Sequence, residues 1–196
     1  MKTTNPNDYP ELLAIFRIGL LHGFITPKEV TDWADTLIEQ DEQPDYFIIE
    51  LSLSGQDKSE KQLSLLNEFI GQNPPSLSGR IILGLLHQKF NSGQLPLQKV
   101  VRAMYWLHRE ADFTDLEKSF IYGLDDDYDL AVSNTWGSLE QVEDLVPQFL
   151  EIYKDFRLDN AYQWKELENT VEPKLQALLQ KELQQAAKNN QQRGNK

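Results

Sequence analysis

Residues 138–156 read SLEQVEDLVPQFLEIYKDF, and this stretch indicates the class of fold. Its apolar residues recur at intervals of three and four, which is the spacing of one face of an α-helix. Ser138 stands just before the first of them and predicts the helix start as an N-cap. Pro147 lies inside the stripe, where a proline removes a backbone hydrogen bond, so we expect it to kink or split the helix. The stripe consists of Leu139, Val142, Leu145, Phe149, Ile152 and Phe156.

The rest of the chain repeats this helical pattern. Two segments have the form of a capping box, Thr26-Pro27-Lys28-Glu29 and Thr114-Asp115-Leu116-Glu117, and each predicts a helix start. Proline and glycine separate further apolar segments, and no segment alternates with the period of a strand. The sequence therefore predicts an all-α fold of about eight or nine helices. Further helices are expected over 46–53, 58–70, 77–90, from Pro96 onward and over 159–188, the last with a boundary at Pro173.

Length and composition suit one globular domain. The chain has 196 residues, of which 40% are hydrophobic and 10% aromatic. We expect one helical domain over residues 1–185 and a disordered tail over 186–196, which is rich in Gln, Asn and Lys.

Two similar segments of the sequence raise the question of an internal repeat. Gly19-Leu20-Leu21-His22 recurs as Gly84-Leu85-Leu86-His87, which suggests repeat units over 10–72 and 76–135. One interpretation is a duplicated pair of helical-hairpin units in a right-angled or solenoid-like stack. The alternative is that leucine-rich helices resemble one another by chance.

The negative charge is concentrated in one region. Residues 110–156 contain thirteen Asp and Glu and two Lys, a net charge of −11 out of −12 for the whole chain. A localised acidic surface attracts basic partners and repels nucleic acid and anionic membranes. We therefore expect a basic protein partner, with no nucleic acid and no membrane; the oligomeric state stays open.

The sequence lacks the residues on which several classes of function depend. The chain has no Cys, which excludes disulfides, thiolate nucleophiles and cysteine-ligated zinc. Its first eight residues lack the apolar segment of a signal peptide, so the expected location is the cytoplasm. The sequence contains no GxSxG, Walker or GxGxxG motif. We expect a protein that is not an enzyme and that needs no cofactor.

Metal binding is not expected either. The run from Asp125 to Asp129 fails the EF-hand pattern, because Leu130 stands where the loop needs Gly and Trp136 where it needs Glu. His22, His87 and His108 lack metal-ligand spacing. His22 and His87 are expected near helix C-termini, where they interact with the helix dipole.

The acidic region supplies the candidate contact residues. Interfaces use aromatic anchors ringed by polar groups, so we take two aromatic residues as anchors and the neighbouring carboxylates as their rim. These residues are Asp125, Asp126, Asp127, Tyr128, Asp129, Trp136, Glu140, Glu143 and Asp144. The alternative for Trp136 is simple packing at a helix junction.

A family resemblance lies in the first quarter of the chain. The pattern comprises Gly23-Phe24-Ile25-Thr26-Pro27-Lys28-Glu29-Val30, Trp33-Ala34-Asp35, Leu37-Ile38 and Ile48-Ile49-Glu50-Leu51-Ser52. Within residues 12–55 it resembles small acidic bacterial proteins of unassigned activity, some of which resemble immunity proteins of polymorphic toxins. The resemblance implies an inhibitor of a toxin and brings no catalytic residues.

Three functional hypotheses follow. The first is an immunity or inhibitor protein whose acidic region 110–156 blocks a basic toxin, such as a nuclease. The second is a helical-repeat scaffold or adaptor that binds a partner in a groove. The third is a metal-dependent enzyme that uses carboxylates.

Overall fold

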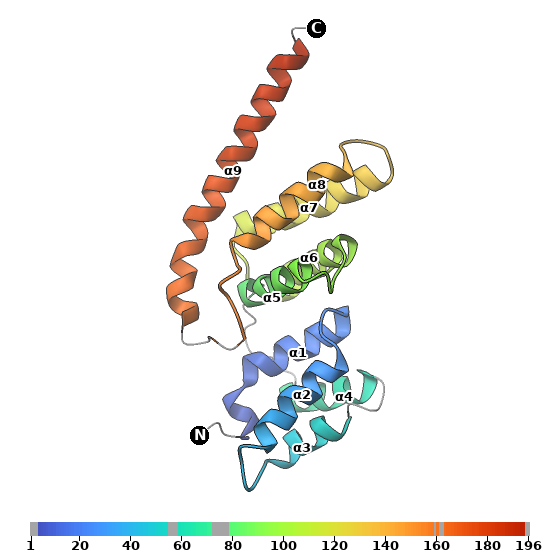
Figure 1. Ribbon diagram of the computed structural model, residues 1–196, viewed down its shortest axis with the longest axis vertical. Coiled ribbons are helices and arrows are strands. Elements are labelled where there is room, and N and C mark those ends of the chain that lie inside the picture. Colours follow the sequence, from blue (N-terminus) through green and yellow to red (C-terminus); the bar gives the residue numbers. More distant parts are fainter. Residues whose placement is uncertain (1–3, 55–58, 72–78, 159, 161–162, 195–196) are drawn as a thin grey trace. The chain divides into compact units, whose positions relative to one another are not determined.

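Figure 1 shows the computed structural model of the chain, which describes residues 4–54, 59–71, 79–158, 160 and 163–194. Those residues form nine α-helices and one short 3₁₀-helix and no strand, which confirms the predicted all-α class. Contacts divide the chain into two compact units, one of residues 1–77 with 110–112 and one of 78–109 with 113–196. The expected breaks at residues 55 and 73–76 lie outside the described residues.

The first unit contains four α-helices around an apolar core. In α2 the predicted capping box is present: the Glu29 backbone N–H donates to Thr26 Oγ1 (3.3 Å), and the Thr26 N–H donates to Glu29 Oε2 (2.8 Å). Helix α3 has the predicted bounds. The elements are η1 (Pro6–Asp8), α1 (Pro10–His22), α2 (Pro27–Ile38), α3 (Tyr46–Leu53) and α4 (Ser59–Ile70).

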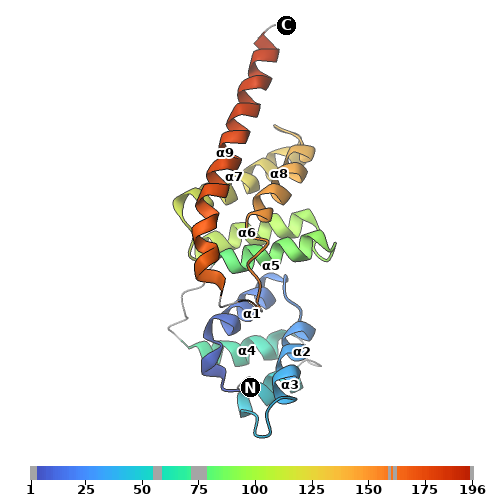
Figure 2. The same ribbon diagram turned by 60° about the vertical axis from the view of Figure 1, so that its left-hand side comes forward.

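The second unit contains the remaining α-helices. Helices α7 and α8 lie side by side in both views (Figures 1 and 2). Helix α9 contacts α8, and its Val171 and Leu175 side chains are fully buried. The C-terminal end of α9 extends beyond α7 and α8 in both views. The elements are α5 (Gly79–Asn91), α6 (Leu97–Glu110), α7 (Asp115–Val132), α8 (Leu139–Glu151) and α9 (Trp164–Gly194).

Helix α8 is not split at Pro147, and it is shorter than predicted. Pro147 neither splits nor ends the helix, which runs unbroken from Leu139 to Glu151. Residue Glu143, whose carbonyl loses its helical partner at Pro147, is exposed, so water can satisfy that carbonyl. The helix stops at Glu151, before the predicted end at Phe156, and a series of turns follows.

A glycine of α5 accounts for those turns. A Cβ on Gly84 would lie 2.2 Å from the carbonyl oxygen of Phe156 and 2.7 Å from that of Tyr153. The backbone after α8 therefore passes directly over α5, which only a residue without a side chain permits. This close approach places the fully buried Tyr153 ring in the core of the second unit.

Helix α9 ends later than its predicted end at residue 188. Its predicted start at residue 159 lies outside the described residues, and the described helix begins at Trp164. It continues through Pro173 to Gly194, whereas the sequence predicts disorder from residue 186.

The same type of turn connects α1 to α2 and α5 to α6. The backbone N–H groups of Phe24 and Ile25 both donate to the carbonyl of Gly19, and those of Gln94 and Leu95 both donate to Lys89. Gly23 and Gly93 occupy the left-handed region, with φ of 74° and 72°. The matching turns are 70 residues apart, whereas the predicted repeat paired Gly19 with Gly84, so the structure does not confirm that repeat.

Candidate partner-binding site

A buried polar network fixes the start of α7. The Glu117 side chain is fully buried, and its carboxylate accepts hydrogen bonds from Arg80 Nε (2.8 Å), Tyr153 Oη (3.0 Å) and the Thr114 backbone N–H (2.8 Å). Thr114 caps α7 in return, as predicted. Burial alone would raise the pKa of Glu117, but the hydrogen bonds from Arg80 and Thr114 outweigh it and lower the pKa. Burial, followed by the charge of Glu117, raises the pKa of Tyr153.

Three of the predicted contact residues face α6 and bind within the chain. Arg102 forms ion pairs with both Asp125 and Asp129, and its guanidinium lies 5.7 Å from the centre of the Tyr128 ring. Asp125 and Tyr128 are only 6% and 8% exposed. Burial raises the pKa of Asp125 even though Arg102 opposes that shift. Tyr128 and these two carboxylates therefore hold α7 against α6.

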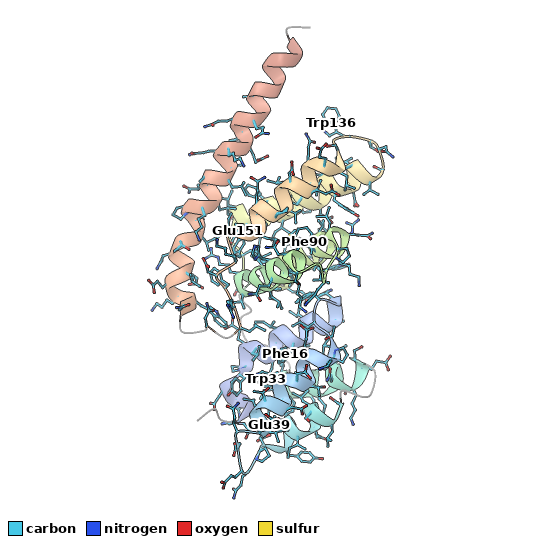
Figure 3. The ribbon with its side chains drawn as sticks, in the orientation of Figure 1. Phe16, Trp33, Glu39, Phe90, Trp136 and Glu151 are labelled. Atoms are coloured by element: carbon cyan, nitrogen blue, oxygen red, sulfur yellow. The ribbon has the colours of Figure 1, made fainter. Side chains whose placement is uncertain are left out.

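The other predicted residues lie on α7, on α8 and in the loop between these helices. Trp136 is 70% exposed, and Figure 3 shows its ring pointing outward from the loop between these helices. The loop holds this position because the backbone N–H groups of Thr135 and Trp136 both donate to the Leu130 carbonyl. Asn134 adopts a left-handed conformation with φ of 55°. Exposed apolar side chains surround this loop: Leu130, Val132 and Leu139.

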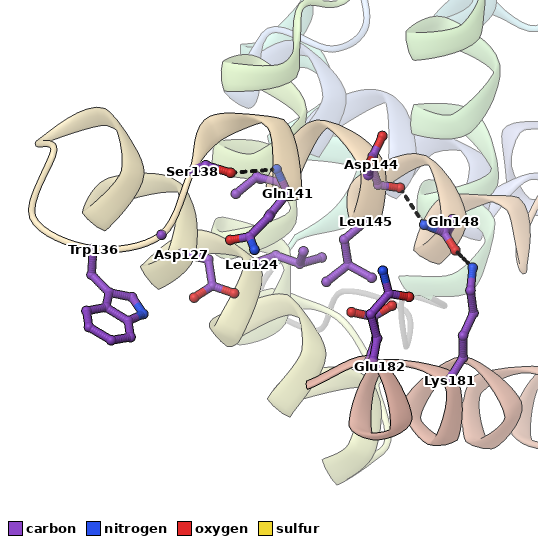
Figure 4. Close-up of a pocket in the computed structure, with 13 residues that line it drawn as sticks. Leu124, Asp127, Trp136, Ser138, Gln141, Asp144, Leu145, Gln148, Lys181 and Glu182 are labelled. Atoms are coloured by element: carbon purple, nitrogen blue, oxygen red, sulfur yellow. Dashed lines mark hydrogen bonds between the residues drawn. The ribbon is translucent and has the colours of Figure 1, made fainter. Parts of the chain in front are cut away.

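Trp136 stands at the edge of a pocket of about 430 Å³ between α7, α8 and the C-terminal half of α9 (Figure 4). Asp127 comes from α7, Asp144 from α8 and Glu182 from α9. Lys181 of α9 donates a hydrogen bond to the Gln148 side chain of α8, which ties these two helices together. We call this the polar pocket; it is lined by Leu124, Asp127, Trp136, Gly137, Ser138, Gln141, Val142, Asp144, Leu145, Gln148, Lys181, Glu182 and Gln185.

A second hollow of about 390 Å³ adjoins the polar pocket and is mostly apolar. The two share Leu124, Asp127, Leu145 and Glu182. We call this the apolar groove; it is lined by Leu116, Ser119, Phe120, Gly123, Leu124, Asp127, Leu145, Leu179, Glu182 and Leu183.

No basic side chain of the described residues pairs with the carboxylates of this surface. Within the described part of the chain, no Lys, Arg or His side chain forms an ion pair with Asp126, Asp127, Glu140, Glu143, Asp144 or Glu182. Partial burial, followed by the charge of Asp126, raises the pKa of Asp127. Uncompensated negative charge therefore surrounds Trp136 and both hollows.

The three histidines lie outside the lining of both hollows. His22 ends α1 as predicted, and its Nε2 lies 3.6 Å from Glu110. His108 lies in the last turn of α6. His87 does not end its helix, because α5 continues to Asn91; it is buried, with Nε2 2.9 Å from Glu151. Its position in the core explains this residue better than the helix dipole does.

Among the residues that the structure describes, no cluster of three or more His, Asp or Glu side chains is placed to hold a metal ion. None of the described helices is long and apolar enough to cross a membrane.

Comparisons with known proteins add no relative. No protein-family model, curated protein sequence or solved structure matches the chain. A function can therefore be inferred only from the site itself.

The sequence-based site omitted the residues that α9 contributes. Lys181, Glu182 and Leu183 line the two hollows, although they lie far beyond the acidic region in the sequence. Two signals pointed toward the groove: Leu179 and Leu183 stand four residues apart on one helical face, and Gly123 interrupts the predicted helix of α7.

Proposed function

We propose that this chain is a protein-binding module that holds a basic partner against the outer surface of α7 and α8 and the polar pocket. The observation that carries the proposal is the exposed Trp136 ring, which stands among carboxylates that no basic side chain of the described chain neutralises. A large exposed aromatic residue beside a pocket is typical of an interface anchor.

The negative charge of this surface predicts that the partner is positively charged. Free carboxylates on α7, α8 and α9 create a negative potential at short range, which attracts Lys and Arg and speeds association. The partner's cations would bind here with little competition, since Lys181 is the only cationic side chain in the described lining of the polar pocket and already binds Gln148.

A finer proposal names the kind of partner. A nuclease holds phosphates and therefore has a positive cleft, so an acidic protein that covers the cleft also excludes the substrate. The concentration of charge in residues 110–156 and the resemblance over residues 12–55 support an inhibitor or immunity protein of this type. In this proposal the chain acts by binding and carries out no reaction of its own.

A capture experiment tests the proposal. Tagged wild-type protein and a variant with Asp127→Asn, Asp144→Asn and Glu182→Gln are incubated with lysate of the source organism, and the bound proteins are quantified by mass spectrometry. We expect a basic protein that wild type retains at low salt, that high salt releases and that the variant fails to retain.

The control removes the same amount of charge elsewhere. Three exposed glutamates of the first unit become glutamine: Glu39, Glu42 and Glu60. This control should retain the partner as wild type does. Equal loss in both variants would mean that net charge alone matters, and retention by both would contradict the proposed site.

The adaptor hypothesis makes the opposite prediction. The apolar groove favours it, because an adaptor that holds a peptide mainly through apolar contacts has little need of the surrounding charge. Binding that survives both high salt and the charge-neutralised variant would support the adaptor.

A further inference from the structure

The apolar groove leaves apolar side chains of the second unit exposed. Phe120 and Leu124 of α7, Leu145 of α8 and Leu183 of α9 contribute apolar side chains to its walls. Leu183 is 62% exposed, although it faces a hollow that could hold further apolar atoms. The volume of about 390 Å³ is within the range of ligand-binding sites, roughly 300–1,000 Å³.

Gly123 is the most informative residue of the groove. Glycine within a helix costs roughly 0.5–1 kcal/mol relative to alanine, so it usually has a packing reason. Gly19, Gly79 and Gly84 have one, because a Cβ at any of them would lie within 2.5 Å of a neighbouring atom. A Cβ at Gly123 would meet nothing within 4 Å. The space beside Gly123 is therefore open, and a group from another molecule can approach the backbone of α7 there.

The shape and the charge together describe that group. Apolar side chains from α7, α8 and α9, together with the open space at Gly123, fit the apolar face of a helix, which presents residues at i, i+3, i+4 and i+7 and can approach α7 closely at Gly123. Asp127 on α7 and Glu182 on α9 border the groove, and its described lining contains no cationic side chain. A second copy of this chain is disfavoured, because each copy carries a net charge of −12.

We infer that the apolar groove binds an amphipathic helix of the partner whose apolar face contacts Gly123 and whose flanking Lys or Arg side chains pair with Asp127 and Glu182. The inference deepens the proposed function and depends on it for the sign of the partner's charge. Trp136 and the polar pocket would then contact the partner beyond the end of this helix.

The test uses three fluorescently labelled peptides of about 14 residues, a length of about 21 Å as a helix. The first is an amphipathic peptide of leucine and lysine with helical spacing. The second has the same composition in an order that destroys the apolar face. The third replaces each lysine of the first with glutamate. Binding to the full chain is followed by fluorescence anisotropy at low and high salt.

We expect the amphipathic basic peptide to bind at least about tenfold more tightly than either of the others. Gly123→Leu should weaken this binding about tenfold because the new side chain fills the groove. The same change should raise the melting temperature by roughly 1–4 °C, since leucine favours the helix more than glycine does. Loss of binding in a variant that is at least as stable as wild type cannot come from unfolding. The matched control is Tyr122→Leu, the adjacent position of α7 outside the groove lining, which should bind as wild type does.

The possible failures are distinguishable. Equal, salt-sensitive binding of both lysine peptides that Gly123→Leu leaves unchanged would overturn the inference while supporting a purely electrostatic site. Salt-insensitive binding of the glutamate peptide that equals binding of the lysine peptide would overturn the assignment of a basic partner. Absence of binding by the amphipathic basic peptide would also overturn the inference, and the capture experiment would then test the proposed function independently.

Discussion

Replacing Glu117 with glutamine should destabilise the protein more than any other single change from a carboxylate to an amide on α7. The Glu117 side chain is fully buried, and both of its oxygens accept hydrogen bonds: Oε1 from Arg80 and Tyr153, and Oε2 from the Thr114 backbone and hydroxyl. Glutamine keeps the shape but turns one acceptor into a donor, which leaves at least one of these donors unpaired. It also removes the carboxylate that pairs with Arg80, whose side chain is only 16% exposed.

The magnitude follows from that burial. Removing one partner of a buried ion pair costs about 3–5 kcal/mol, because the remaining charge stays desolvated. At roughly 2–4 °C per kcal/mol for a chain of this size, the melting temperature should fall by roughly 6–20 °C. Thermal and urea denaturation followed by far-UV circular dichroism would measure both quantities.

Asp129→Asn is the matched control. It is the same chemical change on the same helix, and Asp129 also pairs with an arginine, but its side chain is 55% exposed. Exposed pairs contribute only about 0–1 kcal/mol, so this variant should melt close to wild type. A loss of stability in Glu117→Gln no larger than in Asp129→Asn would refute the assignment of Glu117 to the network that holds α7.

The same network predicts a pH dependence. The pKa of Glu117 is lower in the folded chain than in the unfolded chain, where a glutamate titrates near about 4.3. Its contribution to stability is therefore complete above that pH and is lost as the pH falls through the lower, folded-state pKa. The difference in melting temperature between wild type and Glu117→Gln should shrink as the pH falls below about 4.3, and a constant difference would contradict the lowered pKa.

Three further changes test other parts of the structure. Gly84→Ala should cost roughly 1–3 kcal/mol of unfolding free energy, because its Cβ would lie 2.2 Å from the Phe156 carbonyl oxygen; an unchanged urea midpoint would contradict that close approach. Thr26→Ala should cost about 1 kcal/mol because it removes the side-chain cap of α2, and a serine at the same position should restore most of the loss in the same assay. Trp136→Ala should change the unfolding free energy by less than about 0.5 kcal/mol, since the ring is 70% exposed, yet weaken capture of the partner; a large loss of stability would show that the ring packs against the chain instead.

Local signals in the sequence predicted the helices well. Thr26 and Thr114 were recognised as caps because a capping box involves residues only three positions apart, and the structure contains both boxes. The end of α8 could not be predicted in this way. It depends on the approach of the following backbone to Gly84, a residue far away in the sequence.

The candidate site was only partly predictable for a similar reason. Composition located the acidic region, but it could not show that Arg102 engages Asp125 and Asp129 while no cation of the described residues pairs with Asp127. That division depends on which side of α7 faces α6. The contribution of Glu182 depends in turn on the packing of α9, which places a residue outside the acidic region beside it.

The most direct test of the central claim is the salt dependence of the association rate between this chain and the partner that it captures, measured by stopped-flow or surface-based kinetics. If the unpaired carboxylates around Trp136 attract a basic partner, the rate should fall by about tenfold or more from low to high salt, and neutralising Asp127, Asp144 and Glu182 should flatten this dependence. An association rate that stays the same across that range, or that responds equally in wild type and the neutralised variant, would contradict the claim.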